Sequence, residues 1–449
     1  MANKVSEDSQ DSHRGGFGEL GGEERGLIDR SFRERIILIG LIYGERTESS
    51  SLQELEELSQ LVDTAGADVV QTVVQRRSSP DPATFIGQGK AREVYELAEA
   101  LDVDTVVFNE ELTPAQQFNL EKIFKRSALD RTAVILDIFA QNASTPEGKA
   151  QVELAQLQYR LPRLKGQGGQ FSQQAGGIGT RGPGETKLEI DRRRLVRRVH
   201  KLQDQLTTVG AHRKNQSKRR RHSLNQSVAI VGYTNAGKST LLNSLANAGA
   251  MVADRLFATL DPLTRRLQLP GGESIFLTDT VGFVKKLPHQ LVEAFKTTLD
   301  VVIDADLLLH IVDSGHPSPE TQINAVRAVL SEIGADQIPE MLVFNKSDKL
   351  DPSQLLMEYP ESVAISAVTG VGVDKLVTEI GERLRSIWNV VELSIPFDKG
   401  DILAQVHREG QVLVEHATED AIVVQARLDS SAMSRLSSFI VSASGSDVI

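Results

Sequence analysis

The sequence lacks cysteine and long apolar runs, and we expect no export signal. Without cysteine among its 449 residues, the chain cannot form disulfides, iron–sulfur clusters or thiolate zinc sites, and this composition suits a reducing compartment. Residues 1–26 carry no apolar stretch of the signal-peptide type, and nowhere do about 18 apolar residues follow one another. We therefore expect a cytoplasmic protein without a membrane span.

A net charge of −11 hides a strongly basic segment. Between Glu185 and His222 the sequence has 13 Lys and Arg against 4 acidic residues, a local charge of +9, which leaves about −20 for the remainder. The basic residues form two runs, DRRRLVRRVHK and RKNQSKRRRH. A single charge run is usually a solvated helix face, but two runs so close together favour binding to a polyanion such as RNA.

Composition and hydrophobic periodicity divide the chain into five parts. We expect an α/β multidomain protein. Its parts are a disordered acidic tail (1–30), an N-terminal α/β domain (31–141), a long antiparallel helical hairpin with a Gly-rich loop and a basic linker (142–222), a doubly wound α/β domain with a mostly parallel sheet (223–388) and a small C-terminal α+β module (389–449).

Strand and helix patterns alternate in three of these parts. In the N-terminal domain we expect strands at 35–44, 68–75, 104–108 and 132–139 and helices at 51–66, 91–101 and 113–124. In the doubly wound domain we expect strands at 227–232, 305–314, 340–349 and 362–368 and a hairpin at 265–280. In the C-terminal module we expect strands at 390–397, 411–417 and 421–428 and helices at 401–410 and 431–440.

Two apolar stripes flank the Gly-rich segment GQGGQFSQQAGGIGTRGPGE, residues 166–185. Facing stripes bury each other, so they predict an antiparallel hairpin with this loop at its tip. Packing of the two helices on separate neighbouring domains is the alternative. The stripe residues have helical spacing: Ala150, Leu154, Leu157 and Leu161 before the loop, and Leu188, Leu195, Val199, Leu202 and Leu206 after it.

The segment GYTNAGKS, from Gly232 to Ser239, lies between an apolar strand and an apolar helix. It matches the phosphate-binding pattern G-x-x-x-x-G-K-[ST], in which glycines let backbone N–H groups surround the phosphates. Lys238 would reach the β and γ phosphates, and Ser239 would ligate Mg²⁺. The pattern predicts binding of a nucleoside triphosphate.

Two later tetrapeptides point to guanine. In DTVG (279–282), Asp279 would hold Mg²⁺ through water and the N–H of Gly282 would meet the γ-phosphate. In NKSD (345–348), Asp348 would accept hydrogen bonds from N1–H and the exocyclic amine, a donor pair that adenine lacks. Backbone N–H groups of SAV (366–368) would meet guanine O6. In this order, each at a strand end, the motifs predict a GTPase.

Four residues leave the catalytic step open. Thr259 and Thr264 are both candidates for a Mg²⁺-sensing threonine in a segment that orders around the γ-phosphate, or one of them only caps a turn. Phe283 stands where many GTPases have a water-orienting Gln, so we expect slow intrinsic hydrolysis unless a partner or an ion completes the site. Asn235 resembles the asparagine with which some related GTPases hold K⁺, and a simple turn role explains it equally well.

Several stretches together resemble the HflX family of translation-factor-class GTPases, over roughly residues 35–390. They are TFIGQGKAREV, FNEELTPAQQFNLEK, DRTAVILDIFAQNASTPEGKAQVELAQLQYRLPRL, GGIGTRGPGETKLEIDRRR and FATLDPLTRR. The resemblance implies a GTPase that binds the ribosome, chiefly its large subunit, and whose hairpin loop enters near the peptidyl-transferase centre. It also implies splitting or rescue of stalled or idle ribosomes under stress. The family also has a hydrophobic residue at the position of the catalytic Gln, so Phe283 agrees with the resemblance.

The resemblance favours Thr259 over Thr264. It thus implies Lys238, Gly282 and Thr259 as catalytic residues, Ser239 and Thr259 as Mg²⁺ ligands, and K⁺ as a further candidate ion. The expected nucleotide-binding set consists of Gly232, Tyr233, Thr234, Asn235, Ala236, Gly237, Lys238, Ser239, Phe257, Ala258, Thr259, Leu260, Asp261, Asp279, Thr280, Val281, Gly282, Asn345, Lys346, Ser347, Asp348, Ser366, Ala367 and Val368.

The expected partners are GTP or GDP and the ribosome with its rRNA, and we expect a monomer. Phosphate contacts from Lys and Arg predict that binding to RNA depends steeply on salt concentration. Phe171 is the aromatic side chain in the Gly-rich loop that could stack on a base. Two alternatives remain, a GTP-dependent regulatory switch for a protein target and an RNA-remodelling NTPase. The candidate RNA-contacting residues are Arg163, Lys165, Phe171, Arg181, Arg192, Arg193 and Arg194.

Overall fold

The computed structural model describes residues 33–164, 183–221, 226–246, 256–257, 259–284, 296–387, 389–418, 420–428 and 430–444. The chain forms two compact units, each described by itself below. Unit 1 comprises 1–206, 255–260 and 287–295, and unit 2 comprises 207–254, 261–286 and 296–449. The expected acidic tail and residues 165–182 of the Gly-rich loop lie outside the described residues. Within the described ranges, no helix is long and apolar enough to cross a membrane.

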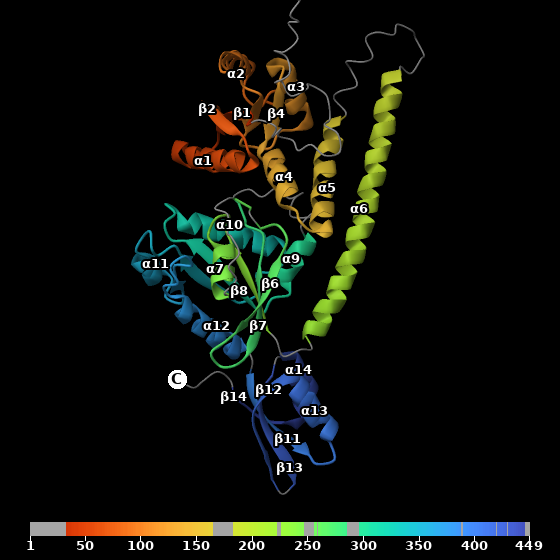
Figure 1. Cartoon of the computed structure of the whole chain (residues 1–449), viewed down its shortest axis with the longest axis vertical. Coiled ribbons are helices and arrows are strands. Elements are labelled where there is room, and N and C mark those ends of the chain that lie inside the picture. Colours follow the sequence, from red (N-terminus) through yellow and green to blue (C-terminus); the bar gives the residue numbers. More distant parts are fainter. Residues whose placement is uncertain are drawn as a thin grey trace, which may run out of the picture. The chain divides into compact units, whose positions relative to one another are not determined.

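Unit 1 contains a parallel four-stranded sheet with the strand order β2-β1-β3-β4 (Figure 1). Alternate residues of the central strand, Ile37, Ile39 and Leu41, share one hydrophobic core with the buried residues of α2 and α3. The elements are β1 (Arg35–Ile42), α1 (Glu48–Ala65), β2 (Asp68–Arg76), α2 (Gln88–Ala100), β3 (Thr105–Phe108), α3 (Pro114–Phe124), β4 (Ser127–Asp130), α4 (Arg131–Asn142), α5 (Pro146–Arg160) and the part of α6 (Pro183–Arg221) up to Leu206.

Capping residues set the ends of these helices. Helix α1 begins after Thr47, whose hydroxyl accepts a hydrogen bond from the Ser50 N–H, and ends at Gly66 with a φ of 94°. The expected glycine stop of this helix is thus present. Helix α3 begins at Pro114 with a capping box formed by Thr113 and Gln116, as the proline in its first turn indicated.

The strand expected at 132–139 is wrong, because these residues lie in helix α4. Their apolar run is buried on every side, and such a run has no period that separates a strand from a buried helix. Asp130 gives the helix its start, since its side chain accepts from the Ala133 N–H. The fourth strand is the short β4 directly before this cap.

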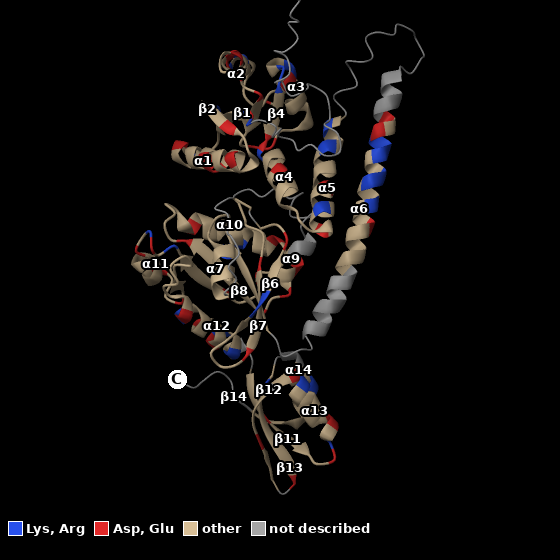
Figure 2. Ribbon diagram, in the orientation of Figure 1, with Lys and Arg blue, Asp and Glu red and all other residues tan. Residues whose placement is uncertain are grey.

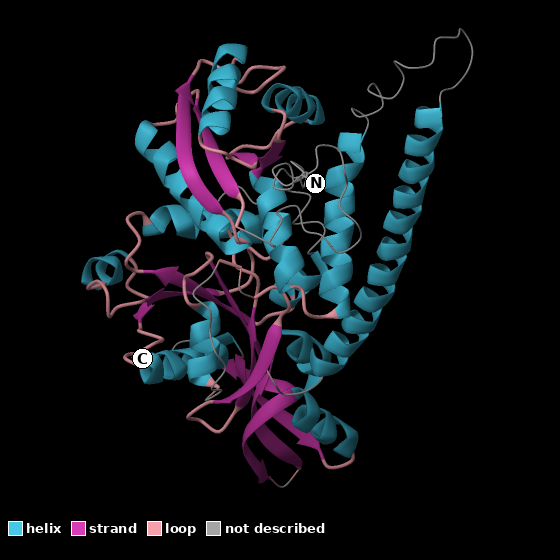
Figure 3. Cartoon of the chain, turned by 45° about the horizontal axis from the view of Figure 1, so that its top comes forward, coloured by secondary structure: helices cyan, strands magenta, loops and turns pink. Residues whose placement is uncertain are grey.

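Helices α5 and α6 form the expected antiparallel pair (Figures 1 and 3). Glu153 of α5 accepts two hydrogen bonds from the Arg198 guanidinium of α6, each at 2.6 Å. The apolar seam between the two helices consists of Leu154, Leu157, Leu202 and Leu206, with Ala150, Leu195 and Val199 packed against it.

Unit 2 contains a six-stranded sheet with the order β10-β9-β8-β5-β7-β6, in which only β6 runs antiparallel. This is the expected doubly wound, mostly parallel sheet. Its elements are β5 (Ser227–Gly232), α7 (Lys238–Leu245), β6 (Leu263–Gln268), β7 (Ser274–Asp279), α9 (Lys296–Ile303), β8 (Leu307–Asp313), α10 (Pro319–Glu332), β9 (Glu340–Asn345), α11 (Ser353–Glu358), β10 (Val363–Ala364) and α12 (Val373–Ile387).

The C-terminal part of unit 2 is an antiparallel sheet with the order β12-β13-β11-β14 and two helices. The helix expected at 431–440 ends early, and the chain continues into a fourth strand, β14, that the sequence analysis missed. The elements are β11 (Asn389–Pro396), α13 (Gly400–Glu409), β12 (Gly410–Ala417), β13 (Ala421–Leu428), α14 (Ser430–Leu436) and β14 (Ile440–Ser444).

Candidate functional site: a guanine-nucleotide pocket

The segment from Gly232 to Ser239 forms the turn between β5 and α7. Gly232 and Gly237 have φ angles of 149° and 95°, and Asn235 has a φ of 60°. A Cβ on Gly237 would stand 2.2 Å from Asn345 Nδ2, so only glycine fits here. This left-handed turn at the start of a helix turns backbone N–H groups toward an anion.

Lys238 is the first residue of α7 and is 6% exposed. Its Nζ donates to the carbonyl oxygens of Gly232 and Tyr233 at 3.1 and 2.8 Å, so the ammonium is held across the turn. Burial lowers the pKa of Lys238 to about 8, and the Asp279 carboxylate opposes this shift. Lys238 is thus positioned as a cation against which a phosphate can bind.

Ser239 and Asp279 meet at the end of strand β7. The Ser239 hydroxyl donates to Asp279 Oδ2 at 2.6 Å, and Asp279 is 1% exposed. A hydroxyl and a carboxylate side by side are hard oxygen ligands of the kind that Mg²⁺ prefers beside substrate phosphates. These residues fit a magnesium ion, which Ser239 would ligate directly and Asp279 would hold through bound water.

The DTVG segment is joined to the phosphate-binding turn through its backbone. The N–H of Thr234 donates to the Phe283 carbonyl at 2.7 Å, and the N–H of Phe283 donates to the Gly232 carbonyl at 3.1 Å. A Cβ on Gly282 would stand 2.8 Å from Thr234 Cγ2 and 3.1 Å from Lys238 Nζ. The glycine is therefore needed for this close approach.

Phe283 itself points into the core and is 1% exposed. Its ring is buried, which is consistent with the expectation that this residue does not orient water. The sequence analysis missed that its backbone ties DTVG to the turn, because backbone hydrogen bonds leave no signal in side-chain patterns.

The NKSD motif connects the phosphate-binding turn to the SAV segment and carries the carboxylate of Asp348. Asn345 Nδ2 donates to the Ala236 carbonyl at 2.8 Å, and Asn345 Oδ1 accepts from the Ala367 N–H at 3.0 Å. The Ser366 hydroxyl donates to Asp348 Oδ1 at 2.6 Å and lowers the pKa of this carboxyl. Asp348 is therefore ionised at neutral pH, as acceptance of two guanine N–H groups requires.

A further pair at this edge of the sheet went unnoticed in the sequence. Lys346 Nζ lies 2.7 Å from Asp313 Oδ2 at the end of β8, and Lys346 has a φ of 66°. The ion pair fixes Lys346 between the base-recognising loop and the neighbouring strand. The position of Asp313 at the end of a buried strand was the available signal, since carboxyl ends of parallel strands gather at one edge.

The structure separates the two threonine candidates. Thr264 lies in β6, where its hydroxyl is hydrogen-bonded to that of Thr278 at 2.9 Å. Thr259 lies before the hairpin, in unit 1, together with Phe257 and Leu260. Thr264 is thus committed to the sheet, and Thr259 stays the proposed Mg²⁺-sensing residue. Ala258 lies outside the described residues.

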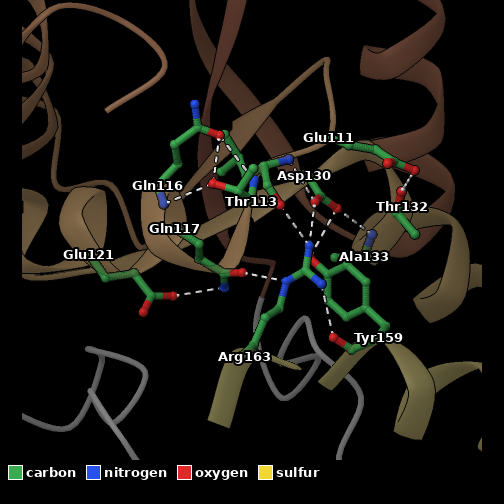
Figure 4. Close-up of polar contacts among 11 residues, drawn as sticks. Glu111, Thr113, Gln116, Gln117, Glu121, Asp130, Thr132, Ala133, Tyr159 and Arg163 are labelled. Carbon is green, nitrogen blue, oxygen red and sulfur yellow. Dashed lines mark hydrogen bonds and ion pairs between the residues drawn. The ribbon is translucent and has the colours of Figure 1, made fainter. Parts of the chain in front are cut away.

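Arg163 has a different environment from the one expected of an RNA contact (Figure 4). Its Nη2 donates to Asp130 Oδ2 at 3.1 Å and to the Leu112 carbonyl at 2.9 Å, and its Nε donates to Gln117 Oε1 at 2.8 Å. The guanidinium also stacks 3.6 Å from the centre of the Tyr159 ring. A phosphate would have to compete with the fully buried Asp130 for this group. Arg163 thus has a role within the fold of unit 1, and its contact with RNA stays a prediction.

The other RNA candidates divide into two groups. Arg192, Arg193 and Arg194 lie on the outer surface of α6 and are exposed. Figure 2 shows the positions of Lys and Arg along the described part of this helix as blue segments of the ribbon. Lys165, Phe171 and Arg181 lie outside the described residues.

Comparison with known proteins agrees with this geometry. Four family profiles match consecutive parts of the chain: GTP-binding GTPase N-terminal (52–140), GTP-binding GTPase Middle Region (142–220), 50S ribosome-binding GTPase (227–346) and HflX C-terminal domain (354–439).

Curated relatives match most of the chain. A GTPase HflX from Caldanaerobacter subterraneus is 45% identical over 412 residues, which cover 91% of this chain and 94% of the relative. A GTPase HflX from Escherichia coli is 40% identical over 395 residues, 87% of this chain and 92% of the relative. A solved GTP-binding protein from Sulfolobus solfataricus in complex with GDP is 24% identical with a TM-score of 0.41, covering 78% of this chain and 98% of that one. The four family profiles and the two curated HflX relatives show that the chain is a GTPase and belongs to the HflX family.

Proposed function

We propose that this GTPase is a cytoplasmic, monomeric factor that binds the ribosome in its GTP state, chiefly at the large subunit. In this proposal the Gly-rich loop between α5 and α6 enters near the peptidyl-transferase centre, and binding splits or rescues stalled or idle ribosomes under stress. The observation that supports it best is the arrangement of α6, which buries an apolar seam on one face and exposes arginines on another.

The exposed arginines of α6 are available to phosphates. The side chains of Arg192, Arg193 and Arg194 are 47%, 68% and 73% exposed, and their carboxylate partners are Glu189 and Asp191 on the same helix, at 3.1 to 3.9 Å. Exposed pairs of this spacing are worth only about 0.3–0.5 kcal/mol each. A row of RNA phosphates can therefore displace them at small cost.

The nucleotide pocket supplies the switch. Lys238 binds the phosphates, Asp348 selects guanine, and the segments of Thr259 and Asp279 order around a γ-phosphate when GTP is bound. When bound by Ser239 and Thr259, Mg²⁺ supplies neutralisation of charge on the phosphates. Hydrolysis removes the γ-phosphate and releases both segments, which resets the factor.

Charge reversal on α6 tests the RNA-binding surface. We expect the triple variant Arg192→Glu, Arg193→Glu and Arg194→Glu to lose co-sedimentation with ribosomes and to keep wild-type GTP turnover without ribosomes. The matched control reverses Arg92, Lys122 and Lys375, three exposed basic residues on α2, α3 and α12, with the same change in net charge. Equal loss in both triple variants would mean that only total charge matters and would remove α6 from the proposal.

Shortening the loop tests the second part of the proposal. A variant in which residues 166–182 are replaced by a short Gly–Ser linker should keep intrinsic hydrolysis, because the pocket lies in other segments, and should lose ribosome splitting. Loss of intrinsic hydrolysis as well would contradict this separation of roles. The two alternative functions predict other outcomes: a switch for a protein target would sediment independently of the α6 arginines, and an RNA-remodelling NTPase would be stimulated by RNA alone.

A further inference from the structure

Phe257 is anchored on the last turns of helix α4. Its ring packs edge-on against Phe139, with 4.7 Å between ring centres and 77° between ring planes, and Phe257 is 2% exposed. Its carbonyl oxygen accepts a hydrogen bond of 2.7 Å from Asn142 Nδ2. The anchored residue precedes Thr259 by two positions, so this contact determines where the segment of Thr259 begins.

The backbone at Phe257 supports a specific anchor. Phe257 has a φ of 55°, a left-handed conformation that is rare for bulky residues and persists only where surrounding contacts impose it. The ring contact with Phe139 and the hydrogen bond from Asn142 are two contacts of the described residues that hold Phe257 in place.

The first turn of the same helix holds the root of the Gly-rich loop. Asp130 caps α4 and accepts hydrogen bonds from Tyr159 Oη at 3.0 Å and from Arg163 Nη2 at 3.1 Å. Figure 4 shows the Arg163 side chain extended toward this carboxylate. Arg163 is one residue before the last described position ahead of the loop, so the carboxylate fixes the point at which the loop leaves α5.

We propose that Phe257 and Asn142 are positioning residues that tie Thr259 to α4, and that α4 transmits the nucleotide state to the root of the Gly-rich loop. This inference rests on the proposed response of the Thr259 segment to GTP. A helix of 12 residues is a rod of about 18 Å, and its two ends hold the two segments. Ordering of Thr259 therefore either moves α4 together with Asp130 or breaks the Phe257 anchor.

The test uses the full chain without ribosomes, so its failure is distinct from a failure of the proposed ribosome binding. The variants are Asn142→Ala, which removes one hydrogen bond, and Phe257→Leu, which removes the ring contact but keeps an apolar side chain. Gln141→Ala is the matched control, because Gln141 lies beside Asn142 on α4 and bonds to the Ala65 carbonyl instead. Thermal unfolding confirms that each variant is folded.

Two quantities are measured: GTP turnover, and amide hydrogen exchange of residues 131–142 and 152–164 with GDP and with a non-hydrolysable GTP analogue. We expect Asn142→Ala to lower kcat about fivefold, the effect of one lost hydrogen bond of about 1 kcal/mol. We expect a similar loss in Phe257→Leu, which keeps the backbone hydrogen bond but loses the contact between the two rings. KM should stay unchanged in Asn142→Ala, because Asn142 is not among the residues expected to bind the nucleotide. We also expect the exchange difference between the two nucleotides at 152–164 to disappear in both variants and to persist in Gln141→Ala.

A merely structural role of the anchor gives another result. If both variants keep wild-type kcat and the wild-type exchange difference, the inference is wrong. It is equally wrong if Gln141→Ala produces the same losses, since the effect would then reflect general damage to α4.

Discussion

The ammonium group of Lys238 is the expected phosphate-binding cation of the candidate site. This ammonium is buried and its donors are directed at the turn that surrounds the phosphates. We expect Lys238→Ala to weaken GTP binding at least about a hundredfold, because a charge-assisted hydrogen bond is worth roughly 3 kcal/mol. Titration with a fluorescent GTP analogue measures this, with Lys375→Ala on the exposed side of α12 as control. Binding within threefold of wild type would contradict the assigned role.

Asn235 is the residue on which the prediction of a K⁺ ion beside the phosphates depends. Its φ of 60° agrees with a turn role, since Asn tolerates this conformation better than most residues. If its side chain also helps to hold K⁺ beside the phosphates, turnover in KCl exceeds turnover in NaCl, and Asn235→Gly removes the difference while preserving the turn. Equal turnover of the wild type in the two salts leaves Asn235 with the turn role alone.

The buried His310 leads to a prediction of how the free energy of unfolding depends on pH. His310 lies in β8 with its Nδ1 at 2.5 Å from Glu340 Oε1, and burial lowers the pKa of His310 below 6.5 although Glu340 opposes the shift. Between the lowered pKa and pH 6.5, His310 is therefore protonated in the unfolded state and neutral in the folded state. The contribution of His310 to the free energy of unfolding is highest above pH 6.5 and falls as the pH drops from 6.5 toward the lowered pKa.

The variant His310→Gln isolates this contribution. It should flatten the decline of the unfolding midpoint between pH 6.5 and 5 relative to wild type. His416→Gln, at an exposed position of β12, serves as the control and should leave the decline unchanged. A wild-type decline in His310→Gln would assign the effect to other groups.

Among the elements, α5 and α6 depend on their shared seam. Leu202 is 1% exposed within it, and truncation of such a leucine costs about 2–5 kcal/mol. We expect Leu202→Ala to speed hydrogen exchange in both helices by more than tenfold. Ile190→Ala, on the same helix at a position 46% exposed, should change exchange little. Similar effects of the two substitutions would mean that α6 is not held by the seam.

How far the sequence predicted the elements depended on their flanking signals. The sheet of unit 2 and the helix pair followed from clear periods and turns, and the pocket residues from spaced motifs. Helix α4 was mistaken for a strand because its apolar run has no distinguishing period. Strand β14 was missed because Ile440 stands at the end of a helical pattern that tertiary packing interrupts.

The pocket was less predictable where backbone and distant side chains meet. The ties from Phe283 to Thr234 and Gly232, and the pairing of Lys346 with Asp313, depend on which strand ends become neighbours. The commitment of Arg163 to Asp130 likewise depends on a contact between residues 33 positions apart. None of these contacts follows from local sequence.

At the scale of the whole molecule, one segment carries a net positive charge and the remainder carries a net negative charge. Basic residues are concentrated in 185–222, whereas the remainder is acidic, so RNA phosphates would be attracted to this segment and repelled by the rest of the chain. Binding should therefore weaken steeply with salt, and it should depend on the orientation that α6 adopts rather than on net charge.

The most direct measurement of the central claim is sedimentation through sucrose gradients with 70S ribosomes and with separated subunits, in the presence of GTP, GDP or a non-hydrolysable GTP analogue. The account predicts co-sedimentation with the large subunit when the analogue is bound, much weaker binding with GDP, and conversion of 70S particles into subunits with GTP or the analogue. Equal sedimentation with GDP and the analogue, or no association with the large subunit, would contradict it.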